Sequence, residues 1–152
     1  MELLVKKCQT PQWFVSTVTL LNRSVVVVVD DEGAVAHYWE RSLKARYKDI
    51  RVPVGYAPKC ISLRSPGQLA SNEQDALSTG TLFLIDYNLG EGEMNGIELI
   101  DALQLTDRAI LVTAHSDDVA ILDEVIKRGI RLLPKTHMYS FRFTIEIGGT
   151  DE

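Results

Sequence analysis

The chain has 152 residues, a length typical of one domain that buries most of its apolar surface. Apolar residues make up 45% and charged residues 24%, which are globular averages that exclude extended disorder and collagen-like architecture. The 16 Lys and Arg residues against 21 Asp and Glu residues give a net charge of −5, so we expect no direct binding to nucleic acid.

The sequence predicts a cytoplasmic protein that is not inserted in a membrane. Its two cysteines, Cys8 and Cys60, lie far apart and have no partner at metal-ligand spacing, which favours reduced thiols. No apolar stretch approaches the roughly 20 residues of a membrane helix, and residues 1–7 lack the pattern of a secretory signal.

Three continuous apolar runs predict buried strands. Residues 25–29 are five valines, residues 81–85 read Thr-Leu-Phe-Leu-Ile, and residues 109–112 read Ala-Ile-Leu-Val. Uninterrupted apolar runs are typical of parallel strands that are covered on both faces. Shorter runs at 60–63 and 130–133 predict two further strands.

Helical patterns separate these runs. Apolar residues recur at three- and four-residue steps between Val35 and Tyr47, which predicts an amphipathic helix. Residues 48–58 are expected to form a loop. Ser65 followed by proline and, three residues on, by Gln68 predicts the capped start of a helix over about 66–77.

Two more helices are predicted nearer the C-terminus. Asn95 with Glu98 three residues later is a capping-box pattern and predicts a helix after residue 95. Ser116 is expected to cap the next helix, with Gly129 just beyond its end. The residues expected on the buried face of that helix are Leu122, Val125 and Ile126.

The alternation of strands and helices defines the fold class. It predicts an α/β domain with a doubly wound, five-stranded parallel sheet and helices on both faces. We expect residues 1–23 to be an N-terminal segment or linker, residues 24–147 to be the domain, and residues 148–152 to be a tail.

Polar residues follow the predicted strands where ligand sites of parallel sheets form. Asp30 and Asp31 follow the first strand, Asp86 the third, Thr113 the fourth and Lys135 the fifth. Three neighbouring carboxylates need a balancing cation, and oxygen ligands suit Mg²⁺. A hydroxyl and an ammonium complement the oxygens of a phosphoryl group. The pattern therefore predicts Mg²⁺-dependent phosphoryl chemistry with Asp86 as the acceptor.

These motifs together are similar to those of a known family. Val-Asp-Asp at 29–31, Leu-Ile-Asp-Tyr-Asn-Leu at 84–89, Met-Asn-Gly at 94–96, Leu-Val-Thr-Ala at 111–114 and Lys135 occur in that order. Over 24–135 the chain resembles the receiver domain of two-component response regulators and hybrid histidine kinases. The resemblance implies the flavodoxin-like strand order 2-1-3-4-5, which is the order of receiver domains.

The resemblance also implies roles for individual residues. Asp86 would accept phosphate from a histidine kinase or a phosphotransfer domain. Asp31 would hold Mg²⁺ directly and Asp30 mainly through water, with Asp86 and the backbone carbonyl of Asn88 completing the metal site. The hydroxyl of Thr113 would bond the phosphoryl oxygen, and the ammonium of Lys135 would pair with it.

The sequence departs from the family pattern near the fifth strand. Proline precedes the lysine in Pro134-Lys135, whereas receivers usually have the reverse order, and Leu132 stands where a switch aromatic is usual. Residues 141–147 alternate like an extended segment, so we expect the usual last helix to be absent or truncated and the dimer built on it to be missing.

Another segment must then cover the sheet where that helix would lie. We expect this cover to come from apolar residues of the N-terminal segment, namely Trp13, Phe14, Val18, Leu20 and Leu21. A shortened ending of this kind resembles the C-terminal receiver of hybrid sensor histidine kinases, so the chain is expected to be a fragment of such a kinase.

Other interpretations remain open on sequence grounds. The chain is alternatively a phosphorylation-independent, receiver-like protein-binding module, or a small aspartyl-phosphate phosphatase, although Asn88 stands where such enzymes want a second acid. A flavin-binding flavodoxin is disfavoured because the carboxylates would repel its phosphate. Taken singly, Glu32 and the acids before it could merely stabilise a helix start, Thr113 could be a turn residue and Lys135 a surface charge.

Overall fold

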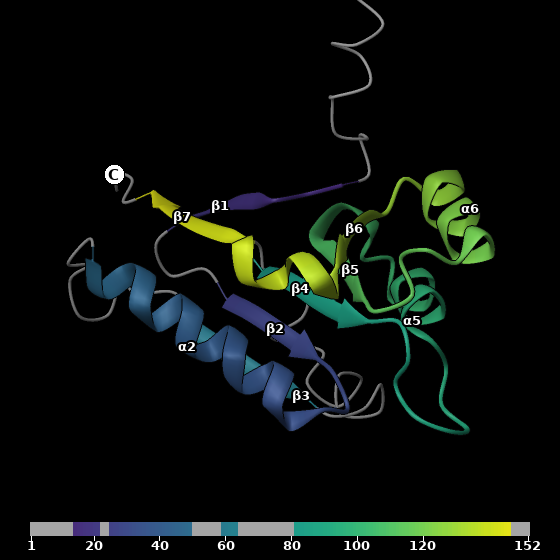
Figure 1. Ribbon diagram of the computed structural model, residues 1–152, viewed down its shortest axis with the longest axis horizontal. Helices are drawn as coiled ribbons and strands as arrows, with labels where there is room; N and C mark the ends of the chain where they lie inside the picture. The colour runs from purple at the N-terminus through teal and green to yellow at the C-terminus, as the bar shows by residue number, and fades with distance from the viewer. Residues whose placement is uncertain (1–13, 22–24, 50–58, 64–80, 147–152) are drawn as a thin grey trace, which may run out of the picture.

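The computed structural model describes residues 14–21, 25–49, 59–63 and 81–146 (Figure 1). Its main sheet has five strands in the order β3-β2-β4-β5-β6, and all neighbouring strands are parallel. The strands are β2 (Val25–Val29), β3 (Lys59–Leu63), β4 (Thr81–Asp86), β5 (Ala109–Thr113) and β6 (Arg131–Pro134). With β2 counted as the first, this is the predicted order 2-1-3-4-5, and the predicted fold class is confirmed.

Helices cover the main sheet on both faces (Figure 1). The helix α2 (Gly33–Asp49) lies on one face, and α5 (Gly96–Leu103) and α6 (Val119–Arg128) lie on the other. Alternate residues of β2 serve the two layers: Val26 and Val28 pack in the core beneath α2, and Val27 and Val29 in the core beneath α5 and α6. In the described ranges no helix combines the length and apolarity needed to cross a membrane.

A second, smaller sheet lies beside α2. It consists of β1 (Thr17–Leu21) and β7 (Arg142–Glu146), which run parallel with Thr17 opposite Arg142. A short 3-10 helix, η2 (Lys135–Ser140), joins β6 to β7. The described residues after β6 therefore form a 3-10 helix and a strand instead of an α-helix, as the alternation of residues 141–147 predicts.

Aromatic side chains attach this small sheet to the main core. Phe141 and Phe143 are buried, and their ring centroids lie 5.5 and 5.9 Å from that of Trp39 on α2, both in edge-on geometry. Leu20 of β1 is buried in the same cluster. The small sheet thus packs on the same face of the main sheet as α2 and covers the part of that face that α2 does not reach.

The N-terminal segment contributes to this cover as expected. Leu20 is buried, Val18 packs partly buried against the core, and Phe14 is half-buried. Phe14 also bridges to Leu132 at the edge of β6, and the backbone N–H of Val15 donates to the Leu132 carbonyl at 3.3 Å. The segment therefore continues the edge of the main sheet before it pairs with β7. Trp13 and the side chain of Leu21 lie outside the described residues.

The start of α6 differs from the sequence prediction. Ser116 is not its N-cap; the cap is Asp118, whose carboxylate accepts hydrogen bonds from the backbone N–H groups of Ala120 and Ile121. A side chain three residues ahead of Ile121 can reach two amides of the first turn, and Ser116 lies too far from them. The helix therefore begins two residues later in the chain than the Ser116 pattern suggests.

The buried face of α6 is also different. Ile121 and Val125 are buried and Leu122 is partly buried, whereas Ile126 is 56% exposed. The placement of Ile126 in the core was therefore wrong. The helix carries two adjacent apolar pairs, so its sequence is compatible with two stripes one residue apart, and packing on the sheet selects the earlier one.

The other capping predictions are confirmed where they can be compared. Asn95 and Glu98 form a complete capping box at α5, each side chain accepting from the other's backbone N–H. Gly129 ends α6 with a φ of 71°, a left-handed conformation that favours glycine. The loop predicted for 48–58 and the helix predicted for 66–77 fall wholly or largely outside the described residues.

The aromatic contact between the two sheets should make a large contribution to stability. We expect Phe143→Ala to lower the free energy of unfolding by about 3–5 kcal/mol, because it leaves a cavity beside Trp39 and Phe141. The matched control Ile126→Ala removes an exposed side chain and should change the free energy by less than about 0.5 kcal/mol. Urea denaturation checks both values, and a small effect of Phe143→Ala would contradict this packing.

Candidate functional site

The carboxyl ends of the main strands bring the predicted site residues to one edge of the sheet. Asp30 directly follows β2, Asp86 ends β4 and Thr113 ends β5. Because Val29 lies opposite Ile85 in the β2–β4 pair, the two aspartates leave adjacent strands at the same level. Lys135 follows Pro134, which lies opposite Thr113 on β6. Parallel pairing alone therefore gathers side chains from four separate parts of the chain.

The ammonium of Lys135 lies among three carboxylates. Its Nζ is 3.3 Å from Asp30 Oδ2, 3.1 Å from Glu32 Oε1 and 3.3 Å from Asp86 Oδ2. Lysine reaches this point even though it comes after the proline, since Lys135 directly follows the end of β6. The reversed order of Pro134 and Lys135 thus leaves the lysine within reach of the acids.

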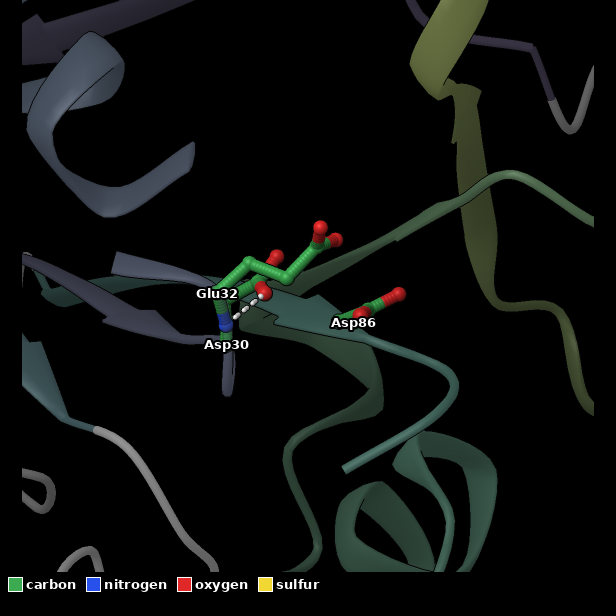
Figure 2. A group of neighbouring side chains, drawn as sticks. All are labelled: Asp30, Glu32 and Asp86. Carbon is green, nitrogen blue, oxygen red and sulfur yellow. Dashed lines mark hydrogen bonds between the residues drawn. The ribbon is translucent and has the colours of Figure 1, made fainter. Parts of the chain in front are cut away.

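The three carboxylates form one group. Oxygens of Asp30, Glu32 and Asp86 all lie within 4.8 Å of one another (Figure 2). Asp30 and Asp86 are buried, and Glu32 is exposed. The backbone N–H of Glu32 donates to Asp30 Oδ1 at 2.8 Å, which fixes the turn that carries both side chains.

Burial and mutual repulsion alter the acidity of the two aspartates. Burial, and then the neighbouring charge of Asp30, raise the pKa of Asp86 from 3.8 to about 6, although Lys135 opposes this. Burial also raises the pKa of Asp30. Burial alone would lower the pKa of Lys135, but attraction to Asp86, a hydrogen bond to Glu32 and the charge of Asp30 outweigh it and raise that pKa.

Two predicted residues, Asp31 and Asn88, lie at the mouth of the site. A pocket of about 190 Å³ opens beside Asp86 and Lys135, and Asp31, Asn88 and His115 help to line it. Asp31 and Asn88 are both exposed. The Asn88 side chain accepts a hydrogen bond from the backbone N–H of Gly90 at 3.3 Å, which shapes the loop after β4.

Thr113 lies deeper than these residues. It is fully buried at the end of β5, and its Oγ1 accepts a hydrogen bond from the backbone N–H of His115 at 3.0 Å. A hydroxyl that accepts one bond keeps its own proton for donation. Thr113 therefore retains a donor at the edge of the sheet on which Asp86 lies.

The group is suited to a divalent cation. When all three carboxylates are ionised, the one ammonium leaves two negative charges of the group without compensation. Carboxylate oxygens are the ligands that Mg²⁺ prefers, and Mg²⁺ commonly uses one or two of them together with water and substrate phosphate. The donor chemistry of this edge therefore fits Mg²⁺.

Close packing fixes the backbone on which Asp86 sits. The N–H of Gly96, the first residue of α5, donates to the Tyr87 carbonyl at 2.8 Å. A Cβ at Gly96 would lie 2.3 Å from the Asp86 carbonyl oxygen and 2.8 Å from Leu111 Cδ1. Only glycine allows the helix to approach the strand end this closely. Gly96 of the Met-Asn-Gly motif thus packs directly against the Asp86 backbone.

Glu32 is a member of the group that the residue pattern did not predict. In the sequence it stands among acids that are typical of a helix N-terminus. Its position two residues after Asp30 was the available signal, since a turn of that length can return the second side chain to the same side. The conformation of that turn is set by the hydrogen bond from the Glu32 backbone N–H to Asp30 Oδ1, and residue types alone do not specify it.

No protein-family model matches the sequence, and no curated protein matches it. Several solved structures are similar in shape. A sensor protein from Polaromonas sp. JS666 is 18% identical with a TM-score of 0.54, covering 75% of this chain and 85% of its own. The signal receiver domain of an HD domain-containing protein from Pseudomonas fluorescens Pf-5 is 18% identical with a TM-score of 0.55, covering 78% and 80%.

A third similar structure is the beryllofluoride-activated NtrC4 receiver domain dimer. It is 19% identical with a TM-score of 0.53, and the match covers 77% of this chain and 95% of that chain. The chain therefore has the fold of response-regulator receiver domains. The acidic group at its sheet edge lies where this fold class of parallel sheets forms its ligand sites.

Substitution of Gly96 should disturb the backbone segment that carries Asp86. We expect Gly96→Ala to lower the free energy of unfolding by about 1–3 kcal/mol or more, since the added methyl must displace the Asp86 backbone or Leu111. Ala102→Ser, on the exposed side of the same helix, is the control and should have little effect. Chemical denaturation measures both, and an unchanged Gly96→Ala protein would rule out the close approach.

Removing the charge of Asp86 should stabilise the metal-free protein at neutral pH. Between the unfolded pKa of 3.8 and the folded pKa of about 6, the folded protein binds a proton that the unfolded chain does not, so stability falls as pH rises through this window. In EDTA at pH 7.5 we expect Asp86→Asn to raise the free energy of unfolding by about 1–3 kcal/mol.

The pH dependence is the decisive part of this measurement. The melting temperatures of both proteins should converge as the pH falls from about 6 to 3.8, and the difference should vanish below 3.8, where Asp86 is neutral in both the folded and unfolded states of the wild-type protein. The control Asp31→Asn removes an exposed charge and should leave stability unchanged. If Asp86→Asn is less stable at pH 7.5, the bond to Lys135 outweighs the burial of the charge.

Proposed function

We propose that the chain is a phosphoacceptor receiver domain of a two-component phosphorelay. Asp86 would accept a phosphoryl group from the phosphohistidine of a histidine kinase or phosphotransfer domain, in a Mg²⁺-dependent reaction. The observation that carries this proposal is the placement of Asp86: it is buried at the end of β4, lies beside Asp30, and is 3.3 Å from the ammonium of Lys135. The receiver fold of the similar structures supports it.

The chemistry requires an ionised acceptor. An Asp86 oxygen would attack phosphorus as the bond from phosphorus to the histidine nitrogen breaks, so an acyl phosphate forms and the imidazole leaves with the electron pair. With a pKa of about 6, Asp86 is mostly ionised at neutral pH and available as the nucleophile. A bound Mg²⁺ would supply neutralisation of phosphoryl charge, and we assign its site to Asp30, Asp31, Asp86 and the Asn88 carbonyl as candidates.

Two other residues would stabilise the phosphorylated state. Lys135 already donates a hydrogen bond to Oδ2 of Asp86, so its ammonium needs only a small movement to pair with a phosphoryl oxygen on that carboxylate. Thr113 would donate its hydroxyl proton to another phosphoryl oxygen while it still accepts from His115. The same bonds would draw the end of β5 and the start of α6 toward Asp86, and this movement is the proposed signal.

The context of the domain is part of the proposal. We place it in the cytoplasm, as the receiver of a hybrid sensor histidine kinase, with residues 24–147 as the receiver domain. Support comes from the Pro134-Lys135 step and from the strand and 3-10 helix that the described residues form after β6. The partner is a histidine kinase or phosphotransfer domain, and neither direct contact with nucleic acid nor a dimer through the usual last helix is expected.

Phosphorylation by a small phosphodonor tests the proposal. We expect incubation with acetyl phosphate and Mg²⁺ to give a single phosphoryl adduct by intact mass, because the site positions the acceptor for any suitable donor. EDTA should abolish the adduct, and so should Asp86→Asn. Lys135→Met should reduce its formation by about tenfold or more through loss of the ammonium. Asp101→Asn, at an exposed acid on α5, is the control that should react normally.

One observation favours a second candidate function. Leu132, where receivers usually carry a switch aromatic, is fully buried in the core beneath α5 and α6 and has no ring to rotate. A receiver-like module that binds protein partners without phosphorylation would need no such switch. Absence of an adduct in folded protein that binds Mg²⁺ would favour this module and contradict the phosphoacceptor proposal.

A further inference from the structure

We propose that an exposed side of α6 binds a second copy of this chain, with the two α6 helices antiparallel. The inference is separate from the phosphoacceptor proposal, because α6 carries none of the residues assigned to the phosphorylation site. It also differs from a dimer through a last helix, since α6 precedes β6 in the chain.

An apolar stripe on α6 is left uncovered. Val119 is 70% exposed and Ile126 is 56% exposed, and Leu122 between them is only partly buried. Residues spaced three and four apart share one face of a helix, and the two exposed side chains lie about 10 Å apart along the helix axis. Single exposed apolar residues are common, but aligned apolar residues form a patch, and such patches mark contact surfaces.

The neighbouring helix α5 does not cover this stripe. Arg128 of α6 forms an ion pair with Asp101 of α5, and Ala120 and Glu124 line the pocket between the two helices. Because a helix turns by about 100° per residue, Ala120, Glu124 and Arg128 lie on the other side of α6 from the stripe. The helix lies at the edge of the described structure, and its apolar stripe has no cover among the described residues (Figure 1).

The charges along α6 indicate what would cover the stripe. The acids Asp117 and Asp118 come at the start of the helix and Lys127 near its end, and all three are exposed. Asp118 caps the helix, whereas Asp117 and Lys127 have no ion-pair partner in the part of the chain that the structure describes. In an antiparallel pair of α6 helices, the acidic start of each helix lies beside the basic end of the other. A parallel pair would place like charges side by side.

A second copy fits this pattern through two-fold symmetry. Every contact across a two-fold interface occurs twice, so a pairing of Asp117 with Lys127 of the other copy is matched by a second one. With Leu122 near the axis, Val119 of each helix meets Ile126 of the other, and both exposed side chains become covered. One side of a short helix is a small contact surface, so the dimer is weak and reversible.

Sedimentation equilibrium of the full chain, without a phosphodonor, tests the proposal. We expect the wild-type protein to be monomeric at about 10 µM and to dimerise between about 0.1 and 1 mM. Ile126→Asp should raise the dissociation constant of the dimer by about tenfold or more, because it places a charge in an apolar contact. Tyr139→Ser removes an exposed apolar side chain from η2 and is the matched control that should leave the dissociation constant unchanged.

Charge reversal tests the antiparallel arrangement. Asp117→Lys and Lys127→Glu should each weaken self-association by about threefold or more, because like charges then meet across the interface. An equimolar mixture of these two variants should associate as the wild-type protein does, since each reversed charge meets its opposite on the other variant.

Three results would overturn the inference. They are a wild-type protein that stays monomeric at about 1 mM, a dimer that Ile126→Asp leaves intact, and a mixture that associates no better than either charge variant alone. Because the substituted residues are exposed, the variants should have equal melting temperatures at low concentration, which excludes misfolding as the cause of any loss.

Discussion

Two buried carboxylates on adjacent strands set the conditions that the rest of the site must meet. Asp30 and Asp86 leave β2 and β4 at the same level, so burial and mutual repulsion both oppose their ionisation. Lys135 relieves part of this cost, because its ammonium contacts both. The demand for a further cation follows from this electrostatic conflict, because one ammonium faces three carboxylates.

The framework around the acids is correspondingly rigid. Gly96 lets α5 pack against the Asp86 peptide, and the capping box of Asn95 and Glu98 fixes the start of that helix. On the other face, the aromatic contacts of β7 with Trp39 secure the chain that follows Lys135. Packing on both sides of the sheet therefore holds the two buried aspartates, and Glu32 is the most exposed carboxylate of the group.

The parts of this structure that could be predicted from sequence are those with a local signal. Five apolar runs determined the strands, and the polar residues at their ends located the site, since parallel strands end at a common edge. Two features had no unique local signal. Adjacent apolar pairs in α6 allowed two packing faces, so Ile126 was misplaced. The orientation of Glu32 depends on a backbone turn, which residue types do not specify.

The pairing of β1 with β7 had no local signal at all, and it bears on how the chain is made. Paired residues of the two strands lie 125 positions apart in the chain, so on the ribosome β1 has no partner until β7 has been synthesised. Until then the face around Trp39 is exposed and apolar. Closing such a distant pair is slow, and an unpaired strand edge invites association with other chains. The interval between synthesis of β1 and synthesis of β7 is thus one in which a nascent chain would benefit from a chaperone.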